Sequence, residues 1–512
     1  MLVKTYAAAV QGISAISVSI EVNTSKGIQF FLVGLADAAV RESHERIISA
    51  LQVCGYKIPR NRIVINMAPA DIRKEGSAYD LPLSIGILAA TEQVDAARLD
   101  QYVLMGELSL DGSLKPVRGV LPIALQAKAD GFKGFILPLQ NAKEAAIVQG
   151  LEVYGVENLL DVILFFDGKK PLTPMTVDTQ KEFYGKQQAF EMDFSEVKGQ
   201  ENVKRALEVA AAGGHNLIMV GPPGSGKSMM AKRLPSILPP FTLEESLETT
   251  KIHSVAGKIN GNSSLMPQRP FRSPHHTISD VAMVGGGAYP QPGEISLAHN
   301  GVLFLDELPE FNRSVLEVMR QPLEDRMINV SRARFTVDYP AGFMLVASMN
   351  PCPCGYYNHP ERPCFCSSGA VQKYMNRISG PLLDRIDIQI EIVPVPFDKI
   401  SERQPSENSQ AIRERVIRAR HIQEQRFADH PGIYCNAQMT TKLLHQYAVP
   451  DAKGLERLKN AMERLSLSAR AYDRILKVSR TIADLEGEHD IQASHLAEAI
   501  NYRNLDRESW GM

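Results

Sequence analysis

Hydrophobic and polar residues follow two different periods over the first 165 or so residues of the chain. Ile16, Val18, Ile20 and Val22 alternate with polar or small residues, which is the period of a strand. Strand-like apolar runs and helix-like amphipathic stretches then follow one another. The pattern predicts strands over 28–34, 62–69, 102–110 and 134–138 and helices over 36–56, 80–90 and 120–131. This alternation predicts an α/β domain over residues 1–166.

The pattern changes twice more along the chain. Residues 167–193 are polar, contain two prolines and keep no sustained period, so we expect a linker there. A second α/β segment follows over 194–395, and from 396 to 512 the period is mostly helical. We therefore expect two α/β domains joined by a linker, with an all-helical C-terminal part.

The N-terminus resembles neither a signal peptide nor a membrane span. Gln11, Gly12 and Ser14 interrupt its small apolar residues, and no window approaches the roughly 18 consecutive apolar residues of a span. We expect a cytoplasmic chain with no membrane partner, whose six cysteines are reduced or bound to metal. The formal net charge of -2 means that a nucleic acid would have to be bound by local basic loops.

Residues 221–228, GPPGSGKS, fit the phosphate-binding pattern G-x-x-x-x-G-K-[ST]. Glycines let successive backbone N–H groups converge on phosphate, and the following helix adds its N-terminal dipole. Lys227 would reach the β and γ phosphates of ATP, and Ser228 would bind Mg²⁺. The predicted ATP-binding residues are Gly221, Pro222, Pro223, Gly224, Ser225, Gly226, Lys227 and Ser228.

Two further apolar strands end in polar residues that would complete an ATP-hydrolysis site. GVLFLDE ends in Asp306, which would hold Mg²⁺, and Glu307, which would polarise the attacking water. The alternative is a core strand that runs into a polar turn. GFMLVASMN ends in Asn350, which is placed to orient the water. Arg385 in SGPLLDRID and Arg470 in SARAYDRIL are further candidates, although either alone is typical of a surface salt bridge.

Five stretches together resemble one protein family. They are FSEVKGQ, GPPGSGKS, VGGGAYPQPGEISLAHNGVLFLDE, ASMNPCPCGYYNHPERPCFC and ISGPLLDRID. This string resembles the ComM/YifB proteins within the magnesium-chelatase-like AAA+ ATPases, and the likeness covers nearly the whole chain. The resemblance implies a P-loop AAA+ ATPase with a helical lid over 396–512, assembled as a homo-hexamer. It also implies that Asn350 is sensor 1, Arg385 is the finger that reaches a neighbour's ATP, and Arg470 is sensor 2.

The same resemblance implies a function. It suggests an ATP-dependent motor that acts on single-stranded and branched DNA, as a helicase or in branch migration, during natural transformation (competence) and homologous recombination. ATP and Mg²⁺ are the implied cofactors. The alternative is a magnesium-chelatase-type motor or protein remodeller that acts on a protein partner. An ATP-independent binding module is disfavoured because the catalytic set is complete.

The first domain resembles the Lon-type protease fold. Alignment of KEGSAYD with the Lon motif K-D-G-P-S-A-G places Ala78 at the nucleophile, and LPIALQAKAD places Ala127 at the catalytic lysine. Ser77 and Lys128 each lie one position away. One step turns a helical side chain by about 100° or moves a strand side chain to the other face. We therefore expect the fold to be retained and proteolysis to be absent.

A proline-rich loop after the third strand contains four cysteines, spaced C-x-C-x9-C-x-C. Four thiolates can close a tetrahedral zinc site. The C-x-C spacing is tighter than the usual one, so two alternatives stay open: His359 replaces one thiolate, or the cysteines are reduced and unliganded. The candidate ligands are Cys352, Cys354, Cys364 and Cys366.

Residues 324–340, EDRMINVSRARFTVDYP, alternate in period two about a polar turn, which predicts a hairpin. Arg332 and Arg334 lie at its tip. In related ring motors such a hairpin lines the pore, and the copies in a hexamer would concentrate positive charge on the axis, where DNA would run. The alternative is a pair of solvated edge-strand arginines that block aggregation.

Overall fold

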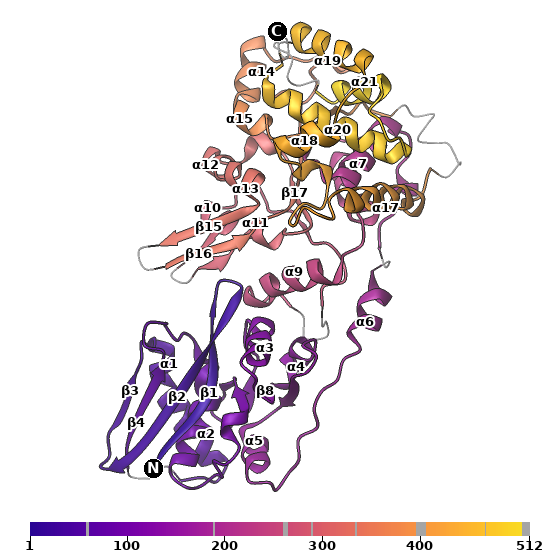
Figure 1. Cartoon of the computed structure of the whole chain (residues 1–512). Helices are drawn as coiled ribbons and strands as arrows, with labels where there is room; N and C mark the ends of the chain where they lie inside the picture. The colour runs from indigo at the N-terminus through magenta and orange to yellow at the C-terminus, as the bar shows by residue number, and fades with distance from the viewer. Residues whose placement is uncertain are drawn as a thin grey trace. The chain divides into compact units, whose positions relative to one another are not determined.

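The structure is a computed structural model that describes residues 1–57, 61–187, 190–259, 265–287, 290–332, 335–395, 406–465 and 467–503 (Figure 1). The chain divides into two compact units, and each is described by itself. The first comprises Met1–Lys186, Leu243–Pro267 and Pro290–Pro292. The second comprises Gln187–Thr242, Gln268–Tyr289 and Gly293–Met512.

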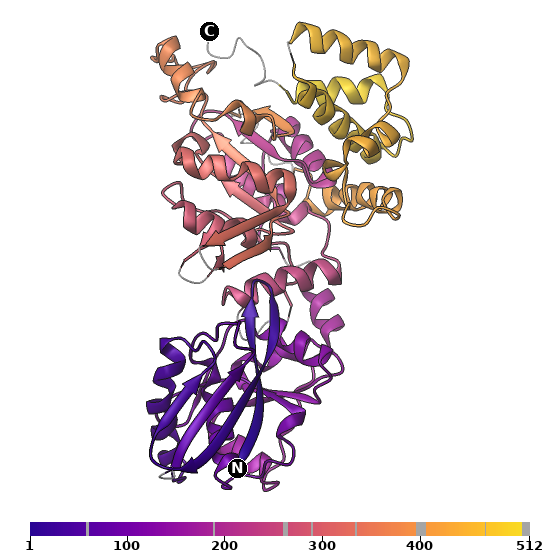
Figure 2. The same cartoon turned by 60° about the vertical axis from the view of Figure 1, so that its left-hand side comes forward.

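The first unit is built on a seven-stranded sheet with the strand order β3-β4-β2-β1-β5-β8-β9. Its strands are β1 (Leu2–Gln11), β2 (Ser14–Lys26), β3 (Phe30–Val33), β4 (Asn61–Ala68), β5 (Tyr102–Leu104), β8 (Gly134–Pro138) and β9 (Glu152–Val156). β1 and β2 form a long antiparallel hairpin, visible as the indigo ribbon in Figure 2. β4 is antiparallel to β2, and the remaining neighbours pair in parallel.

The first unit also contains the helices α1 (Ala38–Val53), α2 (Asp80–Ala90), α3 (Val120–Ala129), α4 (Leu139–Ala145), α5 (Leu159–Phe166), α6 (Thr179–Lys186) and α9 (Leu243–Val255). Every residue of α2 is buried, as expected for a helix that is apolar on all sides. α9 packs on α3, where the backbone N–H of Gly119 donates to the Ser254 carbonyl oxygen over 3.1 Å. The N–H of Leu121 donates to the Ser254 hydroxyl over 3.4 Å, so α9 satisfies free donors at the start of α3.

Most of the elements predicted for the first unit are confirmed, and one is wrong in part. The predicted helix over 80–90 and strand over 134–138 coincide with α2 and β8. The predicted strand over 102–110 is instead split into β5 and a short strand, β6 (Glu107–Leu108), which pairs with β7 (Leu114–Lys115). The break falls at Gly106, whose N–H donates to Ala78 and whose carbonyl accepts from Leu81. A side chain at Gly106 would lie 2.6 Å from Leu114.

The second unit contains a parallel five-stranded sheet with the order β11-β14-β17-β10-β18. Its strands are β10 (Leu217–Val220), β11 (Phe271–Arg272), β14 (Val302–Leu305), β17 (Met344–Met349) and β18 (Ile388–Glu391). Every residue of β10, β14 and β17 is buried. These three strands are neighbours, so their carboxyl ends meet at one edge, which is where open parallel sheets bind ligands.

Two groups of helices complete the second unit. The first group comprises α7 (Glu201–Gly213), α8 (Lys227–Arg233), α10 (Asp280–Val284), α11 (Glu294–Leu297), α12 (Arg313–Val318), α13 (Arg320–Asp325), α14 (Ser368–Met375) and α15 (Gly380–Leu383). The second group comprises α17 (Ser409–Arg426), α18 (Thr441–Tyr447), α19 (Ala452–Arg464), α20 (Ala469–Glu486) and α21 (Ala493–Asn501). α17 and α20 pack on α7, and the C-terminal segment is helical as predicted (Figure 1). In the described ranges, no helix combines the length and the apolar composition needed to cross a membrane.

The predicted hairpin is confirmed from residue 327 to residue 340, whereas residues 324 and 325 of the predicted range belong to the end of α13. β15 (Met327–Arg332) and β16 (Phe335–Pro340) pair antiparallel, with Arg332 opposite Phe335. Arg334 lies outside the described residues, as does the side chain of Arg332. The hairpin itself is therefore established, and the DNA-binding role of its two arginines stays a prediction.

Candidate active site

The sequence GPPGSGKS forms a loop between β10 and α8, as the phosphate-binding pattern predicts. Gly224 and Gly226 have φ angles of 78° and 89°, in the left-handed region that favours glycine. A side chain at Gly221 would lie 2.6 Å from the Ile392 carbonyl oxygen, so only glycine fits there. The Gly221 N–H donates to the Met349 carbonyl oxygen over 3.1 Å, which ties the loop to the end of β17.

Lys227 is buried and folds back onto its own loop. Its Nζ donates to the carbonyl oxygens of Gly221 at 2.7 Å and Pro222 at 2.8 Å, and to Oδ1 of Asn350 at 3.2 Å. Burial lowers the pKa of Lys227 and the carboxylates of Asp306 and Glu307 oppose this shift. The amine therefore lies at the phosphate-binding loop with neutral carbonyl partners that a phosphate group can replace.

Asp306 lies at the end of β14 between two hydroxyl groups. Ser228 Oγ donates to its Oδ2 over 2.7 Å, and Ser348 Oγ donates to its Oδ1. The parallel register pairs Leu305 with Ala347. Asp306 and Ser348, the residues that follow these two, therefore also lie side by side. The structure thus brings the predicted pair of Mg²⁺ ligands, Ser228 and Asp306, together. Ser348 was not predicted, and its only sequence signal is its place two residues before Asn350.

Glu307 follows Asp306 in a left-handed backbone conformation with a φ angle of 55°. Its side chain is more than half exposed, and its Oε2 lies 3.7 Å from Nδ1 of His276. That distance is within ion-pair reach but too long for a direct hydrogen bond. His276 comes from the segment between β11 and α10 and also packs edge-on against Phe311. Sequence reasoning did not identify His276 as a neighbour of the predicted water-activating residue.

Asn350 lies directly after β17, next to the phosphate-binding loop, as shown by its contact with Lys227. Arg385 and Arg470 lie elsewhere. Arg385 is buried and its NH2 lies 2.6 Å from Oε1 of Glu324, while its NH1 donates to the Pro381 carbonyl oxygen over 2.5 Å. Arg470 is exposed in α20, with its NH1 3.8 Å from the nearest paired acid, Asp384. Among the described residues, neither guanidinium pairs with the phosphate-binding loop of its own chain.

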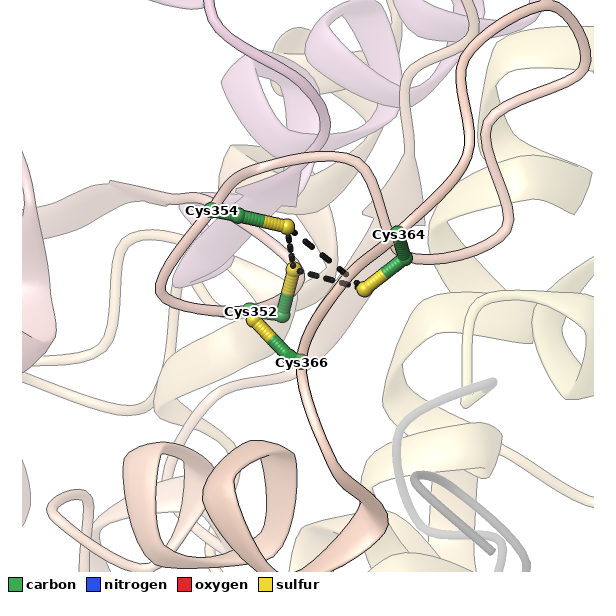
Figure 3. A group of neighbouring side chains, drawn as sticks. All are labelled: Cys352, Cys354, Cys364 and Cys366. Atoms are coloured by element: carbon green, nitrogen blue, oxygen red, sulfur yellow. Dashed lines mark hydrogen bonds between the residues drawn. The ribbon is translucent and has the colours of Figure 1, made fainter.

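The four cysteines of the proline-rich loop converge, as Figure 3 shows. All four sulfur atoms lie within 4.8 Å of one another. The separations are 3.3 Å for Cys352 and Cys354, 3.7 Å for Cys352 and Cys364, and 3.5 Å for Cys354 and Cys364. Tetrahedral zinc with bonds near 2.3 Å places its thiolates about 3.8 Å apart, so this donor set fits zinc. His359 belongs to the same loop but is not a member of the cluster.

The environment of the cluster favours one thiolate. Burial raises the pKa of Cys354, but the Tyr356 backbone N–H and the thiols of Cys352 and Cys366 outweigh this effect and lower the pKa to about 6. A hydrogen bond from the Cys366 backbone lowers the pKa of Cys364. Burial and the neighbouring thiols outweigh it and raise the pKa of Cys364 to about 12. Bound metal would displace the remaining protons, because the thiolate is the ligand.

The residues that approach the Lon catalytic motifs do not form a nucleophile and base pair. Ser77 begins a short helical turn and its hydroxyl donates to Oε2 of Glu107. Lys128 lies in the last turn of α3, with its Cε and Nζ within 4 Å of where a side chain of Gly150 would begin. No hydrogen bond in the described ranges joins Ser77 to Lys128.

Three family models of magnesium chelatase match the chain. They are described as subunit ChlI of Mg-chelatase over residues 20–141, magnesium chelatase subunit ChlI over 193–400, and its C-terminal part over 406–503. Together with the active-site geometry, these matches place the chain among the magnesium-chelatase-like AAA+ ATPases, a family that uses ATP and Mg²⁺.

Individual relatives identify the subgroup of this family to which the chain belongs. The competence protein ComM of Haemophilus influenzae is 45% identical over 509 residues, which cover 98% of this chain and 97% of the relative. YifB of Escherichia coli is 43% identical over 504 residues, with 97% and 96% coverage. The chain belongs to the ComM/YifB family. Lon protease 2 of Bacillus subtilis is 32% identical over 124 residues, 24% of this chain and 22% of the relative, and the N-terminal region is Lon-protease-like.

Proposed function

We propose that the chain hydrolyses ATP in a hexameric ring and uses the energy to move along or unwind DNA. One observation supports the ATPase assignment most strongly. Five predicted residues meet at the carboxyl ends of the adjacent strands β10, β14 and β17, and two hydrogen bonds join four of them directly. These residues are Lys227, Ser228, Asp306, Glu307 and Asn350.

The mechanism assigns each side chain one task. Ser228 and Asp306 would hold Mg²⁺, which neutralises phosphate charge when bound. Lys227 exchanges its carbonyl partners for phosphate oxygens. Glu307 accepts a proton from the attacking water, and Asn350 orients that water with its amide. Arg385 acts on a neighbouring subunit's site and Arg470 acts from the lid.

The proposal of DNA as the polymer rests on the relatives. The Haemophilus influenzae relative is a competence protein, which supports a role in natural transformation with single-stranded and branched DNA as partners. The magnesium chelatase models match residues 193–400 and 406–503, which favours the second candidate, a motor that acts on a protein partner.

The two candidates differ in what stimulates ATP turnover. We expect single-stranded or branched DNA to raise the steady-state ATPase rate of the full-length protein, because a motor couples hydrolysis to its polymer. Measurements should include both DNA forms, and a Lys227→Ala variant as the background. A rate that is unchanged by either DNA form, but raised by a protein partner, would favour the second candidate.

The tip of the β15–β16 hairpin provides a prediction for DNA binding. Loss of Arg332 and Arg334 together should weaken binding to all sequences and flatten the dependence of affinity on salt, because each lost phosphate contact reduces the log–log slope by about one. The measurement is DNA affinity at several salt concentrations. A matched control removes two exposed lysines of α19, Lys453 and Lys459, and should leave the slope unchanged. Equal slopes for both double variants would contradict the assignment.

We also propose that the four-cysteine cluster holds a structural zinc ion. The loop from Cys352 to Cys366 has turns but no helix or strand, so it lacks the framework that regular secondary structure provides. Metal ligation commonly supplies such a framework in short segments.

Metal analysis of the purified protein should find about one zinc per chain. Cys364→Ser should lose most of it, since three thiolates leave the tetrahedron open. Cys54→Ser is the control, because Cys54 belongs to the first unit and is not a member of the cluster, and it should keep the zinc. A folded and active preparation that contains no metal after purification without chelators would contradict the zinc assignment.

We further propose that the Lon-like unit has no proteolytic activity. Ser77 donates its hydroxyl to Glu107, and in the described ranges no hydrogen bond joins it to Lys128, the amine next to the position of the Lon catalytic lysine. Incubation of the full-length protein with ATP and an unfolded protein substrate should leave that substrate uncleaved. Cleavage that Ser77→Ala abolishes would overturn this proposal.

A further inference from the structure

The turn from Cys352 to Gly355 touches the phosphate-binding loop. Gly355 has a φ angle of 84°, and its N–H donates to the Cys352 carbonyl oxygen over 3.0 Å. A side chain placed on Gly355 would lie 2.5 Å from Cδ and 2.8 Å from Cγ of Pro223. The backbone of the turn therefore lies directly against the third residue of GPPGSGKS, closer than any larger residue would allow.

The same turn supplies two thiols of the cysteine cluster. Cys352 is fully buried, and the backbone N–H of Tyr357 donates to its sulfur over 3.3 Å. Cys354 lies one residue before Gly355 and contacts the sulfur of Cys364, which comes from the far end of the loop (Figure 3). Movement of the far end of the loop would therefore move the part that lies on Pro223.

The phosphate-binding loop has a second link to this segment. The Gly221 N–H donates to the carbonyl oxygen of Met349, three residues before Cys352. Between them, Asn350 accepts a hydrogen bond from Lys227. Gly221, Pro223 and Lys227 thus all contact the stretch from Met349 to Gly355, so the geometry of that stretch decides the shape of the loop.

We propose that the turn from Cys352 to Gly355 supports the phosphate-binding loop. Zinc in the cluster raises the affinity for nucleotide by holding Gly355 against Pro223. The inference rests on the proposed ATP and zinc sites. The segment from Cys352 to Cys366 has turns and no helix or strand, so holding it in one conformation without the ion costs conformational entropy. Fixing the turn before nucleotide binds removes this ordering cost from the binding step. Gly355 is a positioning residue in this arrangement because it acts through Pro223.

A pair of glycine substitutions isolates the contact. Gly355→Ala adds the clashing methyl group at a φ angle of 84°. Gly432→Ala adds the same methyl group at a φ angle of 83°, where no atom lies within 4 Å. Both variants place alanine at nearly the same positive φ angle, so their difference reports the contact with Pro223. We expect Gly355→Ala to lose about tenfold or more in affinity for a non-hydrolysable ATP analogue, a change of about 1.4 kcal/mol. Gly432→Ala should bind like the parent protein.

Removal of the metal provides a second test of the inference. Protein stripped of zinc and checked for fold by circular dichroism should bind the ATP analogue more weakly, and added zinc should restore the affinity. Because coupling between two sites is reciprocal, the analogue should raise the equilibrium affinity for zinc, measured by competition with a chelator, by the same factor. Equal nucleotide affinities of folded loaded and stripped protein, or equal affinities of the two glycine variants, would overturn the inference.

These outcomes are separate from failure of the underlying proposals. A parent protein that binds no ATP analogue would refute the ATP site, and a parent protein that binds no zinc would refute the metal site. With ATP binding intact and zinc absent, the glycine pair still tests whether the turn supports the loop. Loss of zinc together with loss of nucleotide affinity in Gly355→Ala supports the coupling, since the new methyl group lies on the Pro223 side of the turn.

Discussion

Glu307→Gln is expected to bind ATP like the parent protein and to lose at least about a hundredfold in ATP turnover, the usual contribution of a general base. The amide keeps the shape of the side chain, but it cannot take a proton from water. Lys227→Ala should instead weaken ATP binding itself, because the buried amine that would contact the phosphates is removed. Binding of a fluorescent ATP analogue and phosphate release, measured on both variants, separate the two effects.

Glu310→Gln is the matched control for Glu307→Gln. Glu310 lies three residues further along, is partly exposed and pairs with Arg377 at 2.9 Å, and no task in hydrolysis is assigned to it. Its substitution should leave ATP turnover unchanged. Normal turnover in Glu307→Gln would remove the assignment of Glu307 as the water-activating residue, whatever the control shows.

The sequence predicts the position of the ATP site well because the site depends on local patterns. Each of its strands is a short buried run that ends in a functional residue, and the glycines of residues 221–228 are required by local backbone geometry. The order of the strands in the sheet cannot be predicted from such local patterns. The hydrogen bond from Ser348 to Asp306 exists because β14 and β17 are neighbours in the sheet, and no local pattern in either strand contains that information.

The fold shows the same division between local and long-range information. α2 was predicted because its sequence is apolar throughout, which is a local property. β1 was not predicted, and its run of three alanines, Ala7 to Ala9, has high helix propensity. In the structure all three alanines are buried and β1 pairs with β2 and β5, so tertiary packing overrides the local preference.

The contacts of His276 and Arg385 also could not be read from the sequence. His276 lies 31 positions before Glu307, on a segment whose path is set by β11 and α10. Arg385 was proposed as a finger that reaches another subunit, but in the isolated chain its guanidinium is paired with Glu324. A side chain that serves a neighbouring subunit needs a resting partner while no neighbour is bound, because a buried unpaired charge is costly. Its Nε has no hydrogen-bond partner among the described residues.

Arg385→Ala is expected to lower ATP turnover of the assembled protein by about a thousandfold or more, the usual contribution of an arginine finger. ATP binding should persist, because Arg385 contacts Glu324 and not the phosphate-binding loop of its own chain. Arg418→Ala, which removes an exposed arginine of α17, is the control and should retain the parent rate.

Subunit mixing tests whether Arg385 acts on a neighbouring chain. Arg385→Ala and Lys227→Ala are each expected to be inactive alone, but an interface between them would combine the intact Lys227 of one chain with the intact Arg385 of the other. When equal amounts of the two variants assemble at random into closed rings, about a quarter of the interfaces combine the two intact residues in this way. The mixture should therefore recover up to about that fraction of the parent rate, with co-assembly verified by size-exclusion chromatography. A co-assembled mixture that stays as inactive as its components, or full activity of Arg385→Ala as a dilute monomer, would show that Arg385 does not act in trans.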